Sequence, residues 1–200
     1  MPNDTLTYKI RDSLYINLTD RCTLECQFCP KYNGTNFVHE FDLTLHERPL
    51  AEEIINQIGD PKKYKEIVFC GYGEPTLKLK VLLVIAKDVK SKGGKVRINT
   101  DGLANLSNKK NVLPEMSNCI DALSISMNAQ TEAVYNRHCQ PALKGSFDAM
   151  LKFIELAPKY IDDVTATAID GLEGVDIQAC KKMAVAMGVK FRTRYLDHVG

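Results

Sequence analysis

The chain has 200 residues, of which 44% are hydrophobic and 26% are charged, and its formal net charge is +1. These values exclude a disordered chain and argue against a strong general attraction to nucleic acid. No run approaches the roughly 18 consecutive apolar residues of a transmembrane helix, and residues 1–11 lack the apolar core of a signal peptide. We therefore expect a cytoplasmic protein with one domain over residues 1–200 and no membrane partner.

Short apolar runs rich in β-branched residues alternate with longer helical patterns along the chain. The short runs predict strands at residues 14–18, 66–70, 95–99, 122–127, 164–169 and 190–195. Most of these runs are almost continuously apolar, which is typical of parallel strands covered by helices.

Helical patterns lie between the predicted strands. They cover residues 49–58, 79–92, 147–157 and 177–187, and the second of them stops at a pair of glycines. Residues 32–48 show no clear pattern and are expected to form a loop. Alternating strands and helices imply right-handed βαβ units, so we predict an α/β fold with a parallel sheet. Six such units make a partial βα barrel with an open side.

Three of the seven cysteines follow the first predicted strand with the spacing C-x3-C-x2-C: Cys22, Cys26 and Cys29. Three thiolates on one loop can bind a compact iron–sulfur cluster. Because a 4Fe–4S cube normally takes four cysteines, three leave one iron without a protein ligand. An open coordination position is what a catalytic metal site needs.

Other interpretations of the cysteines remain open. A structural zinc site usually has a second close pair of ligands, and Cys70, Cys119, Cys139 and Cys180 form no such pair. A ferredoxin-type cluster uses a run of four cysteines. The three cysteines could also be structural residues that lie together by chance.

The cysteine spacing, with an aromatic Phe28 before the last cysteine, resembles the signature of the radical S-adenosylmethionine (SAM) superfamily. Three later segments also resemble motifs of that superfamily: Gly71-Tyr72-Gly73-Glu74-Pro75-Thr76, Asn99-Thr100-Asp101-Gly102 and Ser124-Ile125-Ser126-Met127-Asn128. In the first of these, Tyr72 splits the usual pair of glycines. Each segment lies at the carboxyl end of a predicted strand, and residues 66–76, 97–102 and 122–128 are most similar to the small TatD-associated radical SAM proteins.

The resemblance implies a 4Fe–4S cluster whose open iron binds the amino and carboxylate groups of SAM. It further implies reductive cleavage of SAM to a 5′-deoxyadenosyl radical, which abstracts hydrogen from a substrate. The expected partners are reduced ferredoxin or flavodoxin as electron donor and a TatD-type neighbour. The expected activity is that of an oxidoreductase or modifying enzyme, and the substrate can be a small molecule, a peptide or a nucleotide.

The motif residues suggest individual roles in binding SAM. Gly71 and Gly73 would bring backbone groups close to the methionyl amine because they lack side chains. Glu74 would accept a hydrogen bond from that amine, unless it is simply an exposed loop acid. Ser126 and Asn128 suit the ribose hydroxyls, although residues of these types also cap strand ends.

Residues outside the motifs complete the predicted site. Phe28 would pack beside the adenine or shield the cluster from water. Arg192 and Arg194 alternate on the last predicted strand and share a face, which we expect to be the barrel interior. We assign Arg194 to the SAM carboxylate. Thr165 and Thr167 share a face by the same rule and line the adenosine pocket or fill the barrel.

The remaining cysteines and histidines carry weaker expectations. Cys70 and Cys139 are candidates to face the substrate, to donate hydrogen or to bind a second metal, although free cysteine is more often a small buried hydrophobe. Cys119 and Cys180 are expected in the core. No histidine shows ligand spacing, and His138 is the only one singled out.

Two rival functions compete with the leading one. A glycyl-radical-enzyme activase typically has Asn-Pro shortly after the third cysteine and a Trp or Gly near the first. Here Pro30-Lys31 follows Cys29, residue 21 is Arg, and the chain has no Trp. A non-enzymatic iron–sulfur or zinc module would form no 5′-deoxyadenosine from SAM.

Overall fold

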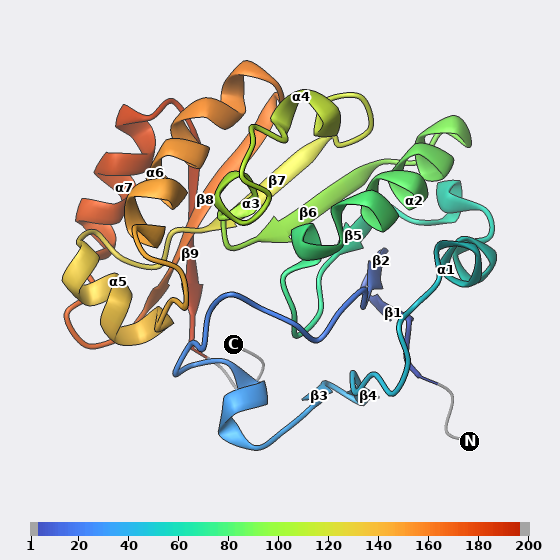
Figure 1. Cartoon of the computed structure of the whole chain (residues 1–200), viewed down its shortest axis with the longest axis horizontal. Helices are drawn as coiled ribbons and strands as arrows, with labels where there is room; N and C mark the ends of the chain where they lie inside the picture. The colour runs from blue at the N-terminus through green and yellow to red at the C-terminus, as the bar shows by residue number, and fades with distance from the viewer. Residues whose placement is uncertain (1–3, 197–200) are drawn as a thin grey trace.

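The central feature of the fold is a seven-stranded sheet with the order β1-β2-β5-β6-β7-β8-β9 (Figure 1). The computed structural model describes residues 4–196. The strands of this sheet are β1 (Thr7–Ile10), β2 (Ser13–Ile16), β5 (Ile67–Phe69), β6 (Val96–Thr100), β7 (Ala122–Ser126), β8 (Asp163–Asp170) and β9 (Lys190–Tyr195). All neighbouring pairs from β2 to β9 are parallel, and β1 pairs antiparallel with β2.

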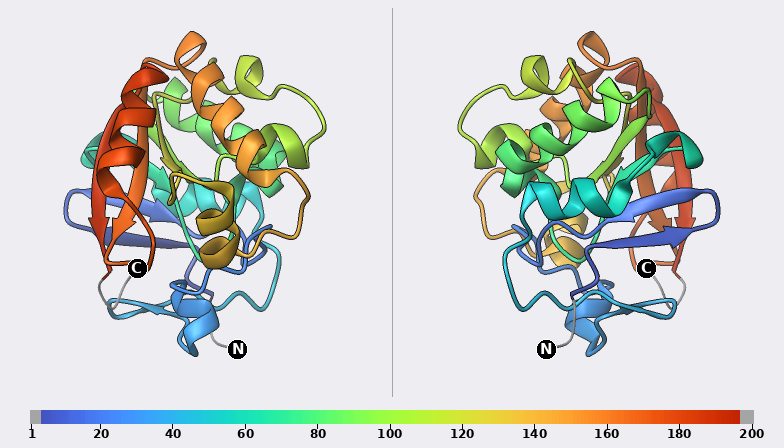
Figure 2. Two further views of the ribbon diagram at one scale, coloured as in Figure 1. Left: turned by 90° about the vertical axis from the view of Figure 1, so that its left-hand side faces the viewer. Right: turned by 90° about the vertical axis from the view of Figure 1, so that its right-hand side faces the viewer.

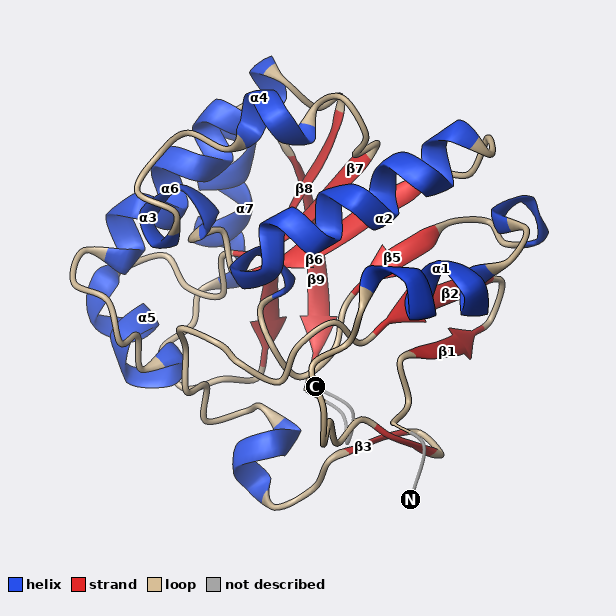
Figure 3. Ribbon diagram, turned by 45° about the vertical axis from the view of Figure 1, so that its right-hand side comes forward, coloured by secondary structure: helices blue, strands red, loops and turns tan. Residues whose placement is uncertain are grey.

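The six predicted strands are confirmed as the six parallel strands β2 and β5 to β9, and the predicted α/β partial barrel is confirmed with them. The sheet curves so that the β1–β2 hairpin and β9 stand toward the same open side (Figure 2). Helices cover the other face of the sheet (Figure 3). The carboxyl ends of the parallel strands therefore meet at one edge of the half-barrel, as in a complete βα barrel.

The four predicted helices are confirmed with small shifts at their ends. They are α1 (Ala51–Ile58), α2 (Leu79–Ser91), α6 (Ser146–Leu156) and α7 (Ile177–Ala186). The structure adds α3 (Ala104–Ser107), α4 (Leu113–Met116) and α5 (Glu132–Cys139), and short 3₁₀ helices η1 (Pro30–Asn33), η2 (Pro61–Lys63), η3 (Pro75–Lys78) and η4 (Ala157–Lys159). No helix within residues 4–196 is both long enough and apolar enough to cross a bilayer.

The expectation of a plain loop over residues 32–48 is wrong. This segment contains the end of η1 and a small antiparallel hairpin, β3 (Phe37–Val38) and β4 (Phe41–Asp42). The hairpin has only two residues in each strand, so alternation of apolar residues gives no readable signal. Its position is set by contacts that are distant in sequence, because the Tyr72 hydroxyl donates a hydrogen bond to the Phe37 carbonyl.

The core lies between the sheet and its helices. Ile67, Phe69, Ile98, Leu123 and Ile125 are each no more than 1% exposed and belong to one apolar cluster with residues of α2, α4 and α6. Burying these side chains is the main stabilising contribution to a fold of this type. The alternate residues of the same strands point to the concave face, where the functional candidates lie.

Candidate active site

A cavity of about 390 Å³ lies at the carboxyl ends of the parallel strands, and every predicted site residue lines it. These residues are Cys22, Cys26, Phe28, Cys29, Gly71, Gly73, Glu74, Ser126, Asn128 and Arg194. They come from the loop after β2 and from the ends of β5, β7 and β9. The structure thus brings together residues that are up to 172 positions apart in the sequence (22 to 194).

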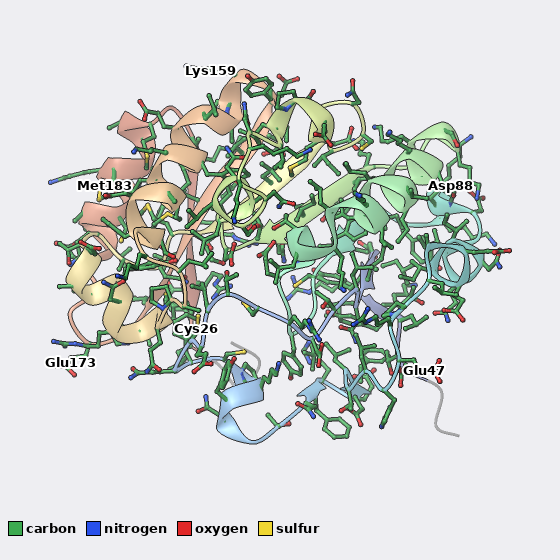
Figure 4. The ribbon with its side chains drawn as sticks, viewed as in Figure 1. Cys26, Glu47, Asp88, Lys159, Glu173 and Met183 are labelled. Carbon is green, nitrogen blue, oxygen red and sulfur yellow. The ribbon has the colours of Figure 1, made fainter. Side chains whose placement is uncertain are left out.

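The cysteine loop is held in place by the end of α5 and the residues that follow it. The Glu25 amide donates to the Cys139 carbonyl at 3.0 Å, and the Gln27 amide donates to the His138 carbonyl at 2.9 Å. The Ala142 amide donates in turn to the Thr23 carbonyl at 2.9 Å. Cys26, labelled in Figure 4, lies on this loop beside α5, with Sγ 3.8 Å from the Cys139 carbonyl oxygen. Backbone bonds on both sides therefore fix the positions of the thiols.

All three cysteine thiols favour the protonated state in the absence of a metal. Loss of hydration raises the pKa of Cys22 to about 12, and the nearby Asp101 and Glu74 carboxyls contribute to this rise. A hydrogen bond with Cys139 and burial raise the pKa of Cys26, and burial raises that of Cys29. Metal ligation requires thiolates, so cluster binding here releases protons.

The three thiols are not gathered around one point. Within residues 4–196, no group of three or more His, Cys, Asp or Glu side chains is arranged to hold a metal ion. The thiolate ligands of a four-iron cube each bind a different iron, so they do not have to converge in this way. All three are free cysteines that form no disulfide.

Gly73 joins the loop after β5 to the cysteine loop. A Cβ at this position would lie 2.5 Å from the Arg21 carbonyl oxygen and closer still to that of Thr19. The next residue, Glu74, donates its amide hydrogen to the Arg21 carbonyl at 2.8 Å. The missing side chain of Gly73 therefore allows two backbones to touch. The predicted contact of Gly71 and Gly73 with the methionyl amine stays a prediction.

Glu74 is 4% exposed, so the alternative that it is an exposed loop acid is wrong. Its Oε1 accepts hydrogen bonds from the Thr76 amide, the Thr76 hydroxyl and the Thr100 hydroxyl, at 2.9, 2.6 and 2.9 Å. Its Oε2 accepts from the Asp101 amide at 2.7 Å. The Glu74 carboxylate thereby links the end of β5 to the end of β6.

Asp101 is a second buried acid that the predictions did not assign to the site. Its Oδ2 accepts a hydrogen bond from the Thr23 hydroxyl at 2.8 Å, and its Oδ1 accepts from the Leu103 amide at 2.8 Å. Burial and the charge of Asp101 raise the pKa of Glu74 to about 8, and burial raises that of Asp101 as well. Glu74 therefore retains its proton at neutral pH. The Thr-Asp-Gly turn after β6 was a signal that could have identified Asp101.

Asn128 and Ser126 lie at the end of β7. Asn128 has a φ of 60°, a left-handed conformation that is uncommon outside glycine. It is 2% exposed, and its amide nitrogen donates to Cys139 Sγ at 3.5 Å. Its Oδ1 is buried and has no hydrogen-bond partner among the described residues. Such an orphaned acceptor beside a cavity is suited to a ligand hydroxyl.

Arg192 and Arg194 both line the cavity, as expected of side chains on the inner face of β9. Arg192 donates a hydrogen bond to the Ser124 hydroxyl at 3.2 Å. Arg194 is partly buried, whereas Arg192 is exposed within the open face. Thr167 faces the same side and is 1% exposed, which fits the interior position predicted for it.

The other cysteines divide between the cavity and the core. Cys70 lines the cavity, whereas Cys139 is fully buried behind the cysteine loop and does not line it. Cys119 and Cys180 are buried in the apolar core, as predicted. The His138 ring nitrogen Nε2 lies 2.7 Å from the Glu173 carbonyl oxygen.

An apolar cluster beside Cys29 was not predicted. Tyr8, Leu43 and Tyr72 are its buried members, and Cys29 and Val38 pack against it. Tyr72 is the residue that splits the glycine pair, and its hydroxyl holds the β3–β4 hairpin. The departure from the motif therefore has a structural role, which the spacing of aromatic residues in the sequence could not show.

A sequence profile of the radical SAM superfamily matches residues 16–185. The chain belongs to the radical SAM superfamily. No curated protein matches the chain. The resemblance to the TatD-associated members of the superfamily stays a prediction.

Several solved structures share the fold. TYW1 with a lysine–pyruvate adduct bound has a TM-score of 0.66 at 16% identity, covering 94% of this chain and 66% of its own. Streptococcus suis SuiB bound to precursor peptide SuiA has a TM-score of 0.70 at 13% identity, covering 96% and 40%. Methylornithine synthase (PylB) has a TM-score of 0.59 at 16% identity, covering 92% and 53%. The chain thus spans between 40% and 66% of the length of these three proteins.

Members of this superfamily are enzymes that use a 4Fe–4S cluster and SAM. The cavity of this radical SAM protein fits both groups. Its donor set offers three thiols on one loop, which is one fewer than a closed cube takes. The orphaned Asn128 Oδ1 and the Arg194 guanidinium supply an acceptor and a cation for the polar groups of SAM.

Proposed function

We propose that this chain is an enzyme in which a 4Fe–4S cluster and SAM, when bound, supply a 5′-deoxyadenosyl radical that abstracts hydrogen from a substrate still to be identified. The observation that supports the proposal is the meeting of three thiols with polar groups from three strand ends in one cavity. An oxidoreductase or a modifying enzyme fits this arrangement.

The residues of the cavity have separable tasks in this proposal. Cys22, Cys26 and Cys29 hold the cluster and leave one iron open to SAM. Arg194 binds the SAM carboxylate through its guanidinium fork, because a planar fork matches a carboxylate. Ser126 and Asn128 bind the ribose hydroxyls, and the buried Asn128 Oδ1 accepts from one of them.

Two further residues exclude water from the cavity and orient one of its loops. Phe28 is partly buried beside the cysteines and lines the cavity, so it covers the adenine or the cluster against solvent. Glu74 accepts four hydrogen bonds from its own loop and from the end of β6. It therefore orients the loop that faces the methionyl amine, and it remains the proposed acceptor for that amine.

Radical SAM enzymes need an electron donor and a substrate. We expect reduced ferredoxin or flavodoxin as the donor, a TatD-type neighbour, a cytoplasmic location and a single core domain over residues 1–200.

The test is formation of 5′-deoxyadenosine by the anaerobically reconstituted protein. With SAM and dithionite, the wild-type protein should form this product, detected by mass spectrometry, and the Cys26→Ala variant should form none. Cys180→Ala is the matched control, because Cys180 is a buried core thiol remote from the cavity. A zinc ion or a fully protein-ligated cluster whose spectrum does not respond to SAM would contradict the proposal. It would support the non-enzymatic module instead.

A further inference from the structure

A second and larger cavity, of about 650 Å³, lies on the open side of the half-barrel. Its walls are the β1–β2 hairpin around its turn, the tip of the β3–β4 hairpin, the residues just before β5, the start of β6 and the middle of β9. Figure 2 shows the two hairpins and β9 projecting toward this side in both views. A volume of this size is typical of sites that bind small molecules.

The wall of this cavity carries an excess of positive charge. Five cationic residues line it against three carboxylates: Lys9, Arg11, Lys65, Arg97 and Arg192 against Asp12, Glu40 and Glu66. One pair is neutralised internally, because Arg97 donates from Nε and Nη2 to the two carboxylate oxygens of Glu66, at 3.0 and 2.8 Å. Four cations then face two carboxylates, in a protein whose overall net charge is only +1.

Arg192 stands where this cavity meets the predicted SAM cavity, since it lines both, together with Ile10 and Tyr15. The only hydrogen bond of its guanidinium to the described residues goes to a neutral group, the Ser124 hydroxyl. No carboxylate of residues 4–196 lies within ion-pair distance of it, in contrast to Arg97 and Arg137. Arg192 therefore presents, at the junction of the two cavities, a guanidinium fork that no carboxylate of the described residues compensates.

We propose that the substrate is an anionic small molecule that enters from the open side and whose carboxylate or phosphate group binds to Arg192. The identification of this ligand as the substrate rests on the proposed function, but the anion site itself does not. Carboxylate and phosphate share the bidentate acceptor geometry that a guanidinium recognises. The basic wall raises the local concentration of such an anion.

Isothermal titration calorimetry of the reconstituted protein tests the site, with inorganic phosphate and with succinate as separate probes at 0.15 M NaCl. At least one probe should bind the wild-type protein. Arg192→Gln should weaken that binding on the order of tenfold, and Arg192→Lys should weaken it less, because lysine keeps the charge and loses the fork. Arg137→Gln is the matched control, since it removes an exposed arginine on α5 and should change nothing.

The pattern of results separates the outcomes. Binding of phosphate alone indicates a phosphate ester, binding of succinate alone indicates a carboxylic acid, and binding of both supports the shared anion site. No binding by the wild type, or equal binding by Arg192→Gln, would overturn the proposal and leave Arg192 as an inward charge that protects an edge strand from pairing.

The anion site and the proposed function can fail separately. If anions bind but no 5′-deoxyadenosine forms, the proposed function fails and the site stands. If the product forms without anion binding, only the inference fails.

Discussion

The two faces of the seven-stranded sheet differ in the side chains that they carry. Toward the helices the strands present Phe69, Ile98 and Ile125, all fully buried. Toward the open side they present Arg97, Asn99 and Arg192, which are partly buried or exposed. Because successive side chains of a strand point to opposite faces, neighbouring residues of one strand have separate tasks. The helix face stabilises the fold, and the concave face is left free for polar chemistry.

Substitutions on the two faces should therefore separate stability from binding. Phe69→Ala should lower the free energy of unfolding by about 4 kcal/mol, because it removes a fully buried aromatic side chain and leaves a cavity. Ser126→Ala, on the concave face, should leave the free energy of unfolding within about 0.5 kcal/mol of the wild type. Urea denaturation of both variants is the measurement.

The same two variants should behave in the opposite way toward SAM. Ser126→Ala should weaken SAM binding, whereas the folded fraction of Phe69→Ala should bind SAM as the wild type does. If Ser126→Ala costs as much stability as Phe69→Ala, the two faces do not have the separate tasks described above.

Gly73 is an exception to this division of tasks between the two faces, because it lies on the concave side and yet supports the structure. Gly73→Ala should lower the free energy of unfolding by about 3 kcal/mol, since its Cβ would collide with the backbone of Arg21 and displace the cysteine loop. The iron content after reconstitution should also fall. Gly188→Ala is the control: its φ is 75° and nothing lies near its Cβ, so it should cost only about 1 kcal/mol and leave the iron content unchanged. Full iron content in Gly73→Ala would contradict the role in loop packing.

The sequence permits prediction of the helix face better than of the concave face. Continuous apolar runs identify the six parallel strands, and the cysteine spacing with the motifs at strand ends identifies the residues that line the cavity. Strand β1 and the β3–β4 hairpin were missed because they are short and are fixed by contacts distant in sequence. Helix α5 was missed because it is mostly polar, although its buried residues Tyr135, His138 and Cys139 show helical spacing.

The contacts that hold the site together were also beyond sequence reasoning. The pairing of the cysteine loop with residues 138–142 and the Glu74–Asp101 pair join segments that no local pattern connects. The motifs indicate which residues meet at the strand ends. They do not indicate that Gly73 allows its own loop to contact the cysteine loop, or that Tyr72 holds the β3–β4 hairpin.

The Glu74–Asp101 pair should make stability depend on pH in an unusual direction. The folded pKa of Glu74 is about 8, against a reference value of 4.5, so the folded state holds a proton that the unfolded state releases. The stabilising effect is complete below about pH 4.5 and is lost as the pH rises toward 8. The free energy of unfolding of the cluster-free protein should fall by about 2 kcal/mol between pH 5 and pH 7.

Glu74→Gln should flatten this dependence, because the amide does not titrate. The slope with pH is the readout, since glutamine also loses the acceptor for the Asp101 amide and lowers stability at every pH. Glu115→Gln removes an exposed acid and should keep the wild-type slope. A slope that is unchanged in Glu74→Gln would place the titrating proton elsewhere.

The smallest expected effect concerns Arg194, the concave-face residue assigned to the SAM carboxylate. Arg194→Gln should weaken SAM binding about tenfold, or about 1.4 kcal/mol, because it removes the charge-assisted bonds of the guanidinium fork. Arg194→Lys should recover part of this loss, since it restores the charge without the fork. The measurement is equilibrium binding of SAM to the reconstituted protein, with Arg192→Gln as the comparison on the same strand. Because Arg192 is assigned to the substrate anion, Arg192→Gln should leave the affinity for SAM unchanged. An equal loss of SAM affinity in Arg192→Gln and Arg194→Gln would mean that the two arginines bind one ligand. The division of the concave face into two sites would then be wrong.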